Sequence, residues 1–233
     1  MLTPQQLAHF DTFGFLFFPQ IFSAAEIATF TQTAEEIWRE DPQPVEYEER
    51  RWSFFVERRP LLTQLVTDER IYPIAQQILG PQILWVGSEG NISSKDNVRW
   101  HPDRKYYKEE EQHWMDFDQI KWMIYLDKVD RDSGCLRVIP GSHKMPYHKQ
   151  LAEQEIDPEA QPFGVEGPDI PCAALASVPG DLILFDHRIW HSAFGGGKSR
   201  RYIALKFTAW PSAAHHIDSL KKYGGGVWQC LGE

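Results

Sequence analysis

The chain is poor in cysteine and in positive charge, and it lacks a long apolar run. Its three cysteines, Cys135, Cys172 and Cys230, are too few and too widely spaced for a disulfide framework, and they favour a reducing cytoplasm. The apolar run near the start, residues 13–19, is far too short to span a bilayer. It also lacks the basic flank and the cleavage site of a secretory leader. We therefore expect a cytoplasmic protein that does not bind membranes.

The charge balance excludes a second class of partner. Asp and Glu number 33 against 24 Lys and Arg, so the net charge of −9 repels phosphate backbones and argues against nucleic-acid binding. The chain is also too poor in Gly and Pro, with 16 of each, for a collagen-like protein, and at 13% aromatic residues it is too apolar for a disordered one. We expect one domain over residues 1–233; the oligomeric state is not readable from the sequence.

The first third of the chain has the signals of helix starts. Thr3 with Gln6 and Ser23 with Glu26 are capping boxes, in which each side chain binds the backbone N–H of the other residue. Asp68 is expected to cap a third helix that ends at residues 79–80. Residues 1–80 are therefore predicted to be mostly helical and to pack on the part that follows. A last short helix is predicted over residues 213–223.

After Gly80 the pattern changes to short β-rich runs separated by turn residues. The predicted strands are residues 83–87, 120–126, 136–139, 173–178, 182–185 and 202–207. This pattern predicts a mainly antiparallel β-sandwich or barrel with helices packed outside. The polar, proline-rich residues 151–171 are expected to form a long loop or lid.

One short motif has the spacing of metal ligands. A His-x-Asp sequence in an extended chain points an imidazole and a carboxylate the same way, because residues i and i+2 share a face. With a distant histidine, these groups form the two-histidine, one-carboxylate triad of non-haem iron(II) enzymes. The motif is short enough to occur by chance. It occurs three times, at His9–Asp11, His101–Asp103 and His216–Asp218.

Context separates the three motifs. His9 and His216 lie in predicted helices, where residues i and i+2 diverge by about 200°. His101 instead follows the β-like residues 97–100, which favours His101 and Asp103 as ligands. The third ligand should lie at the end of a later strand, where a side chain is both rigid and open to the site. His187 and His191 both follow such a strand, and the residue pattern leaves both open.

These motifs, taken in order along nearly the whole chain, resemble the phytanoyl-CoA dioxygenase-like branch of the iron(II)- and 2-oxoglutarate-dependent oxygenases. The resemblance rests on the two N-terminal helices, Trp100-His-Pro-Asp103, Ile124-Tyr-Leu-Asp127, Gly134-Cys-Leu-Arg-Val-Ile-Pro-Gly-Ser-His143, Pro179-Gly-Asp-Leu182, His191 and Arg200-Arg201. It implies a double-stranded β-helix, or jelly roll, with its core over residues 81–210. It also implies a dioxygenase that uses iron(II), 2-oxoglutarate and O₂.

Carried over position by position, the resemblance implies His101, Asp103 and His191 as iron ligands. It also implies an arginine for the distal carboxylate of 2-oxoglutarate, and here two arginines stand together. Alternation along the strand favours Arg200, which shares the more polar face, with Arg201 as the second candidate. Asn91 matches the polar residue with which the family holds the co-substrate.

The resemblance implies oxidation of a small molecule, most simply hydroxylation of an unactivated C–H bond with release of succinate and CO₂. Desaturation and ring closure remain open. The basic residues favour an anionic group on the substrate. Candidate substrate contacts are Arg51, Trp100, Lys105, Tyr106, Tyr107 and Trp190. Two other readings stay open: a cupin-like metalloenzyme that does not use 2-oxoglutarate, and a non-catalytic jelly roll that binds a ligand.

Overall fold

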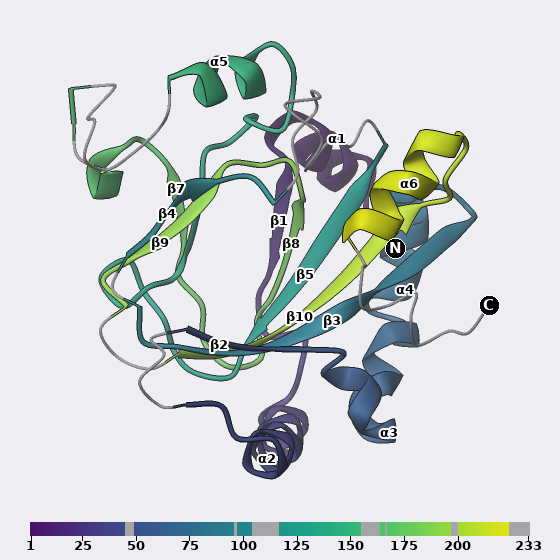
Figure 1. Cartoon of the computed structure of the whole chain (residues 1–233), viewed down its shortest axis with the longest axis vertical. Coiled ribbons are helices and arrows are strands. Elements are labelled where there is room, and N and C mark those ends of the chain that lie inside the picture. Colours follow the sequence, from purple (N-terminus) through teal and green to yellow (C-terminus); the bar gives the residue numbers. More distant parts are fainter. Residues whose placement is uncertain are drawn as a thin grey trace.

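The computed structural model describes residues 1–44, 49–95, 97–103, 117–154, 164–165, 167–196 and 200–223. Two antiparallel sheets face each other and form the body of the molecule (Figure 1). The large sheet has the order β1 (Phe15–Phe18), β8 (Leu182–Asp186), β5 (Gln119–Tyr125), β10 (Arg200–Ala209), β3 (Ile83–Ser93), β2 (Glu49–Ser53). The small sheet has the order β4 (Asn97–His101), β9 (His191–Phe194), β6 (Leu136–Val138), β7 (Ala173–Leu175). This is the predicted jelly roll.

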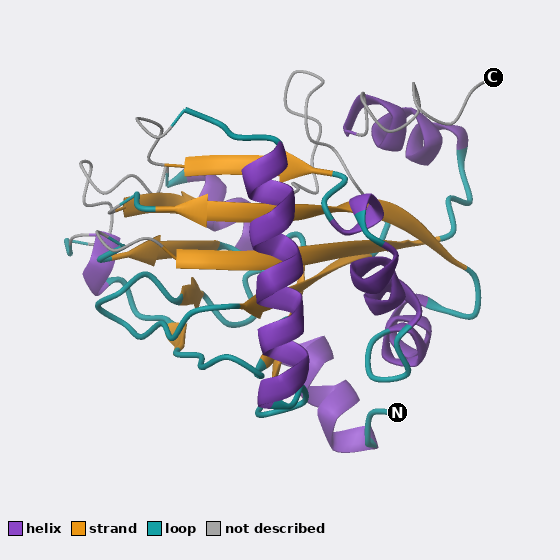
Figure 2. Cartoon of the chain, turned by 90° about the horizontal axis from the view of Figure 1, so that it is seen from below, coloured by secondary structure: helices purple, strands orange, loops and turns teal. Residues whose placement is uncertain are grey.

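The first four helices pack on the outer face of the large sheet, the fifth packs against the small sheet, and the sixth lies at one end of the large sheet. They are α1 (Pro4–Phe13), α2 (Ala24–Glu40), α3 (Pro60–Thr63), α4 (Tyr72–Leu79), α5 (Tyr147–Glu153) and α6 (Ala214–Tyr223). Three short 3₁₀ helices are η1 (Val56–Arg58), η2 (Gln64–Thr67) and η3 (Gly167–Asp169). Figure 2 shows α2 lying across the strands. Within the described part of the chain, no helix is long and apolar enough to cross a membrane.

Both capping boxes are present as predicted. In α1 and α2 the Thr3 and Ser23 hydroxyls accept hydrogen bonds from the backbone N–H groups of Gln6 and Glu26, whose side chains bind back. The prediction for α4 was wrong at its start. The carboxylate of Asp68 binds the backbone N–H and the guanidinium of Arg70 instead, and α4 begins at Tyr72 without a side-chain cap.

Alternation along β5 explains how the core is divided. Its even-numbered residues, Ile120, Trp122 and Ile124, pack under the helices, while Met123 and Tyr125 face the space between the sheets. All seven residues of β5 are buried because both faces of this strand are covered. Burial of each large apolar side chain contributes about 1.5–3 kcal/mol. The helices fill the outer face of the large sheet, so a ligand-binding site on this sheet would lie on its interior face, between the two sheets.

Several strands extend or add to the predicted pattern. β1 and β2 lie within the first 80 residues yet pair with β8 and β3. β3 runs on to Ser93, past the predicted end at Gly87, and β9 begins at His191 itself. Of the predicted lid, α5 and η3 occupy the two ends, and residues 155–163 and 166 lie outside the described part.

Candidate metal centre

Two strands of the small sheet bring the proposed ligands together. His101 ends β4 and His191 begins β9, and their Cα atoms are direct partners in the β4–β9 ladder. Their rings therefore share a face, with centroids 4.4 Å apart. Asp103 lies two residues beyond His101. One potential ligand atom from each of these three residues lies within 4.8 Å of the others.

The hydrogen bonds of the two histidines leave the same ring nitrogen for a metal. Nδ1 of His101 is 2.7 Å from the carbonyl oxygen of Arg99, and Nδ1 of His191 is 2.9 Å from that of Ile189. A carbonyl oxygen only accepts, so each Nδ1 carries the proton and each Nε2 has a lone pair to offer. Such a bond to the far nitrogen is the usual support of a metal-binding histidine.

The electrostatics of the site keep its groups in their metal-binding states. Burial and His101 lower the pKa of His191 to about 3, against the opposite effect of Asp103. Burial would raise the pKa of Asp103, but Lys121 and the neighbouring histidines lower it well below its ordinary value. At neutral pH the cluster therefore offers a neutral imidazole and a carboxylate. This donor set suits a divalent transition metal such as iron(II).

His187, the alternative third ligand, lies near the triad but outside it. Its Nε2 is 3.9 Å from Oδ2 of Asp103, whereas His191 approaches Oδ1 at 4.0 Å. His143, in the Pro-Gly-Ser-His turn, is remote from the triad and binds the carbonyl oxygen of Asp11 through Nε2. The other two His-x-Asp motifs lie in α1 and α6, as predicted.

The two neighbouring arginines point to opposite sides of β10. Arg200 is buried and lines the cavity at the triad. Arg201 points away, where it binds Asp127 through two nitrogens and Glu35 of α2 at 2.6 Å. Among the described residues, the Arg200 guanidinium makes one hydrogen bond, of 3.3 Å to the carbonyl of Lys95. Arg200 therefore retains donors that face the cavity.

Two polar side chains of β3 accompany Arg200. Asn91 and Ser93 lie on the interior face and are buried, and Ser93 is the Cα partner of Arg200. Neither the amide of Asn91 nor the hydroxyl of Ser93 has a hydrogen-bond partner among the described residues. A buried polar group without a partner costs about 1–3 kcal/mol, which a polar ligand would relieve. These residues fit a bound dicarboxylate such as 2-oxoglutarate.

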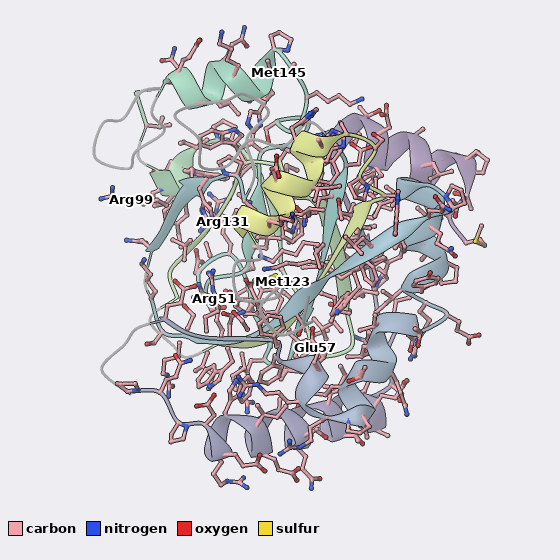
Figure 3. All side chains as sticks on the ribbon, turned by 45° about the vertical axis from the view of Figure 1, so that its right-hand side comes forward. Arg51, Glu57, Arg99, Met123, Arg131 and Met145 are labelled. Carbon is pink, nitrogen blue, oxygen red and sulfur yellow. The ribbon has the colours of Figure 1, made fainter. Side chains whose placement is uncertain are left out.

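The predicted substrate contacts separate into three groups. Arg51 lies on β2 (Figure 3). It lines the cavity and pairs with Glu49 at 3.1 Å. Trp100 and Trp190 belong instead to an apolar cluster with Phe194. The cavity lining does not include these two rings, so the structure gives them a packing role. Lys105, Tyr106 and Tyr107 lie outside the described residues.

The sequence analysis missed charged residues in the interior. Lys121 lines the cavity, and Glu89 and Lys206 lie beside it. A signal was present, because Lys121 and Lys206 each stand between two apolar neighbours in a strand. In a strand buried on both faces, such a lysine needs a partner or a function.

Comparison with known proteins agrees with this geometry. The family model described as "Phytanoyl-CoA dioxygenase (PhyH)" matches residues 10–202. The chain belongs to the phytanoyl-CoA dioxygenase family. The protein is therefore a dioxygenase of the class that uses iron(II), 2-oxoglutarate and O₂.

Individual relatives include ectoine dioxygenase of Bordetella bronchiseptica, which is 25% identical over 219 residues, covering 82% of this chain and 70% of that protein. The iron-bound structure of EctD from S. alaskensis is 25% identical with a TM-score of 0.69, covering 89% of this chain and 77% of that one. HygX from Streptomyces hygroscopicus, solved with nickel and 2-oxoglutarate, shares the fold at 19% identity and a TM-score of 0.72, covering 89% and 87%.

Proposed function

We propose that the protein hydroxylates a C–H bond of a small molecule, with His101, Asp103 and His191 as the iron ligands. The observation that carries this proposal is the meeting of the triad with Arg200 in one cavity. These two imidazoles and one carboxylate would hold iron(II) and leave room on it for 2-oxoglutarate and O₂. When bound, iron(II) and 2-oxoglutarate would supply the oxidation, with one oxygen atom of O₂ going to succinate as CO₂ leaves and the other to the substrate.

The chain's own residues bind and orient these groups. The Arg200 guanidinium presents a planar pair of donors to the distal carboxylate of 2-oxoglutarate. Asn91 offers its amide to the same molecule from the adjacent strand. The hydrogen bonds from Nδ1 of both histidines fix the direction of each Nε2 toward the metal. Of the three ligands, His191 is buried, and His101 and Asp103 are half-buried.

We infer that the substrate is a small molecule with an anionic group. Arg51 at the cavity supports this, because 53% of its side chain is exposed and a ligand can reach it. One relative is an ectoine dioxygenase, and HygX was solved with hygromycin B bound, so small polar molecules are the first compounds to test. We also place the protein in the cytoplasm, because Cys135 and Cys172 are free thiols.

The first experiment is an anaerobic titration of the iron(II)-loaded protein with 2-oxoglutarate. The expected result is the weak visible charge-transfer band of the chelate, absent in His101→Ala and Asp103→Ala. His9→Ala is the matched control, because His9 belongs to a His-x-Asp motif in α1. Iron binding without the band would favour a cupin-like metalloenzyme. Failure to bind iron would favour a non-catalytic jelly roll.

The reaction outcome needs a separate measurement. Once succinate release identifies a substrate, mass spectrometry of the product distinguishes the alternatives. Gain of one oxygen atom supports hydroxylation. Loss of two hydrogen atoms would instead indicate desaturation or ring closure.

A further inference from the structure

Two side chains of the cavity at the triad lie side by side on the interior face of the large sheet. Tyr125 of β5 is the Cα partner of Tyr202 on β10, and Arg200 precedes Tyr202 by two residues on the same face. Such diagonal neighbours have Cα atoms about 7–8 Å apart, within reach of aromatic and long side chains. Tyr125 and Arg200 are both buried, and both line the cavity. The two side chains are therefore close enough to bind the same group.

The polar ends of the two side chains reach the same stretch of the chain, at the start of β6. A Cβ atom on Gly134 would lie 2.6 Å from Nη1 of Arg200, so the guanidinium packs against this glycine. Two residues further on, the backbone N–H of Leu136 approaches the hydroxyl oxygen of Tyr125. Tyr202 packs edge-on against the Tyr125 ring, with the ring centroids 5.7 Å apart. The phenol oxygen and the guanidinium therefore converge at one end of the cavity.

The hydroxyl of Tyr125 has a proton to donate. Burial raises the pKa of Tyr125 above its ordinary value, against the lowering effect of Arg200 and of the backbone N–H of Leu136, so the hydroxyl is protonated at neutral pH. Because an N–H only donates to the oxygen, the hydroxyl proton needs a different partner. Among the residues that the structure describes, no group accepts it. A buried tyrosine hydroxyl usually has a hydrogen-bond partner, so a bound molecule is expected to supply the acceptor.

Arg200, beside this hydroxyl, lacks a negative partner. Its guanidinium donates to the carbonyl oxygen of Lys95, and within the described part of the chain it forms no ion pair with a carboxylate. A buried cation without a counter-charge is costly. A carboxylate would satisfy both groups, because it carries the missing charge and each of its oxygens accepts hydrogen bonds. Water would accept the hydroxyl proton but would not neutralise the guanidinium.

We propose that the hydroxyl of Tyr125 donates a hydrogen bond to the distal carboxylate of 2-oxoglutarate, beside Arg200. This inference rests on the proposed function and gives Tyr125 a role in the choice of co-substrate. A 2-oxo acid with a carboxylate at its far end meets both donors. A 2-oxo acid with a methyl group there leaves the hydroxyl and the guanidinium unpaired, which weakens its binding. Tyr125 therefore favours 2-oxo dicarboxylic acids over 2-oxo monocarboxylic acids.

Tyr125→Phe removes the hydroxyl and keeps the ring. Anaerobic titration of the iron(II)-loaded variant with 2-oxoglutarate should show binding about ten-fold weaker or more, because a hydrogen bond to a charged group is lost. The second probe, 2-oxopentanoate, has the same chelating end but a methyl group in place of the distal carboxylate, and it should bind the variant and the wild type equally. Tyr72→Phe is the matched control. Tyr72 lies on α4, on the outer side of the large sheet, and its variant should change neither affinity.

A double-variant cycle with Arg200→Gln tests whether the two side chains bind the same carboxylate. If they do, the loss caused by Tyr125→Phe should shrink to less than about three-fold in the Arg200→Gln protein, because the carboxylate is then no longer held in place. A role of Tyr125 in packing alone would give the same factor in both proteins. The cycle decides the question if 2-oxopentanoate gives no band with the wild type. Iron(II) affinity, measured by competition with a fluorescent metal chelator, should be unchanged in Tyr125→Phe.

The outcomes separate this inference from the proposed function. Weaker 2-oxoglutarate binding in Tyr125→Phe, with unchanged 2-oxopentanoate binding, supports the inference. Equal 2-oxoglutarate affinity in Tyr125→Phe and the wild type overturns it and leaves the proposed function intact. Equal weakening for both 2-oxo acids also overturns it, because the tyrosine would then act on the chelating end or on the shape of the cavity. Absence of the chelate band in the wild type contradicts the proposed function itself.

Discussion

Lys121 donates a 3.1 Å hydrogen bond to Oδ2 of Asp103, while Oδ1 of the same carboxylate faces Nε2 of His191 at 4.0 Å. The two oxygens therefore have different neighbours, Oδ1 facing His191 and Oδ2 facing Lys121 and His187. This arrangement holds the carboxylate in a single orientation before metal arrives. Lys121 is a positioning residue in this sense.

Lys121→Met should weaken iron(II) binding. Loss of a group that orients a metal ligand typically costs 10–100-fold in affinity, which outweighs the relief of repulsion between the lysine and the metal. Lys121→Gln retains a donor without the charge and should bind iron within a few-fold of the wild type. Competition with a fluorescent metal chelator measures both. Equal or tighter iron binding by Lys121→Met would contradict the positioning role.

Arg200→Gln and Arg201→Gln should have opposite phenotypes. Arg200 lines the cavity, so its variant should need about 100-fold more 2-oxoglutarate to form the chelate band. Arg201 binds Asp127 and Glu35 on the outer side, so its variant should lose about 1 kcal/mol of unfolding free energy and retain 2-oxoglutarate affinity. Anaerobic titration measures the 2-oxoglutarate affinity of each variant, and urea denaturation measures its unfolding free energy. Exchanged phenotypes would reverse the assignment of the two arginines.

The metal-free protein should lose stability as the pH falls below about 6.5. Burial lowers the pKa of His143, against the raising effect of Asp186 and the backbone of Asp11, and Arg188 and Lys144 lower it further. The unfolded chain therefore takes up a proton at higher pH than the folded chain, and acid favours unfolding.

Urea denaturation at pH 7 and pH 5.5 measures this effect. His143→Gln should reduce the difference between the two unfolding free energies, although His148, whose pKa burial also lowers, retains part of it. His9→Gln, at an exposed position on α1, should leave the difference unchanged. A steeper loss in His143→Gln would show that this histidine is protonated in the folded state.

Gly196→Ala should impair 2-oxoglutarate binding and spare the metal site. A Cβ atom at this position would lie 2.0 Å from Nη1 of Arg200 and 2.4 Å from the carbonyl oxygen of Lys95, so the guanidinium must move. Iron affinity should stay within two-fold, because the three atoms nearest this Cβ position belong to Arg200 and Lys95 and not to a ligand of the triad. Titration of the chelate band measures the 2-oxoglutarate affinity, and competition with a metal chelator measures the iron affinity. Unchanged 2-oxoglutarate affinity would mean that Arg200 has room to reorient.

Local features of the fold could be predicted from the sequence. The capping boxes at Thr3 and Ser23 use residues three apart, so the information lies within one turn of helix. Alternation along a single strand likewise separated Arg200 from Arg201 before the structure was known. Each of these predictions needed only residues that lie within a few positions of one another in the sequence.

Features that depend on distant pairing could not be predicted in this way. β2 carries Arg51 into the cavity only because it pairs with β3, and nothing local in residues 49–53 specifies that partner. The cluster of Glu89, Lys121 and Lys206 joins three strands, so the sequence shows a lysine within each of two apolar runs but not the partners that these lysines meet. Asp68 was misread because its capping pattern competes with Arg70, which lies two residues away.

The pairing of His101 with His191 has a consequence for how the chain matures. These ligands are 90 residues apart in the sequence, and they meet only when β4 and β9 have joined. Metal capture therefore has to follow closure of the small sheet, and bound metal then resists the separation of those strands. A chain that has bound iron has therefore already paired β4 with β9. Removal of the iron by a chelator should speed the separation of these two strands.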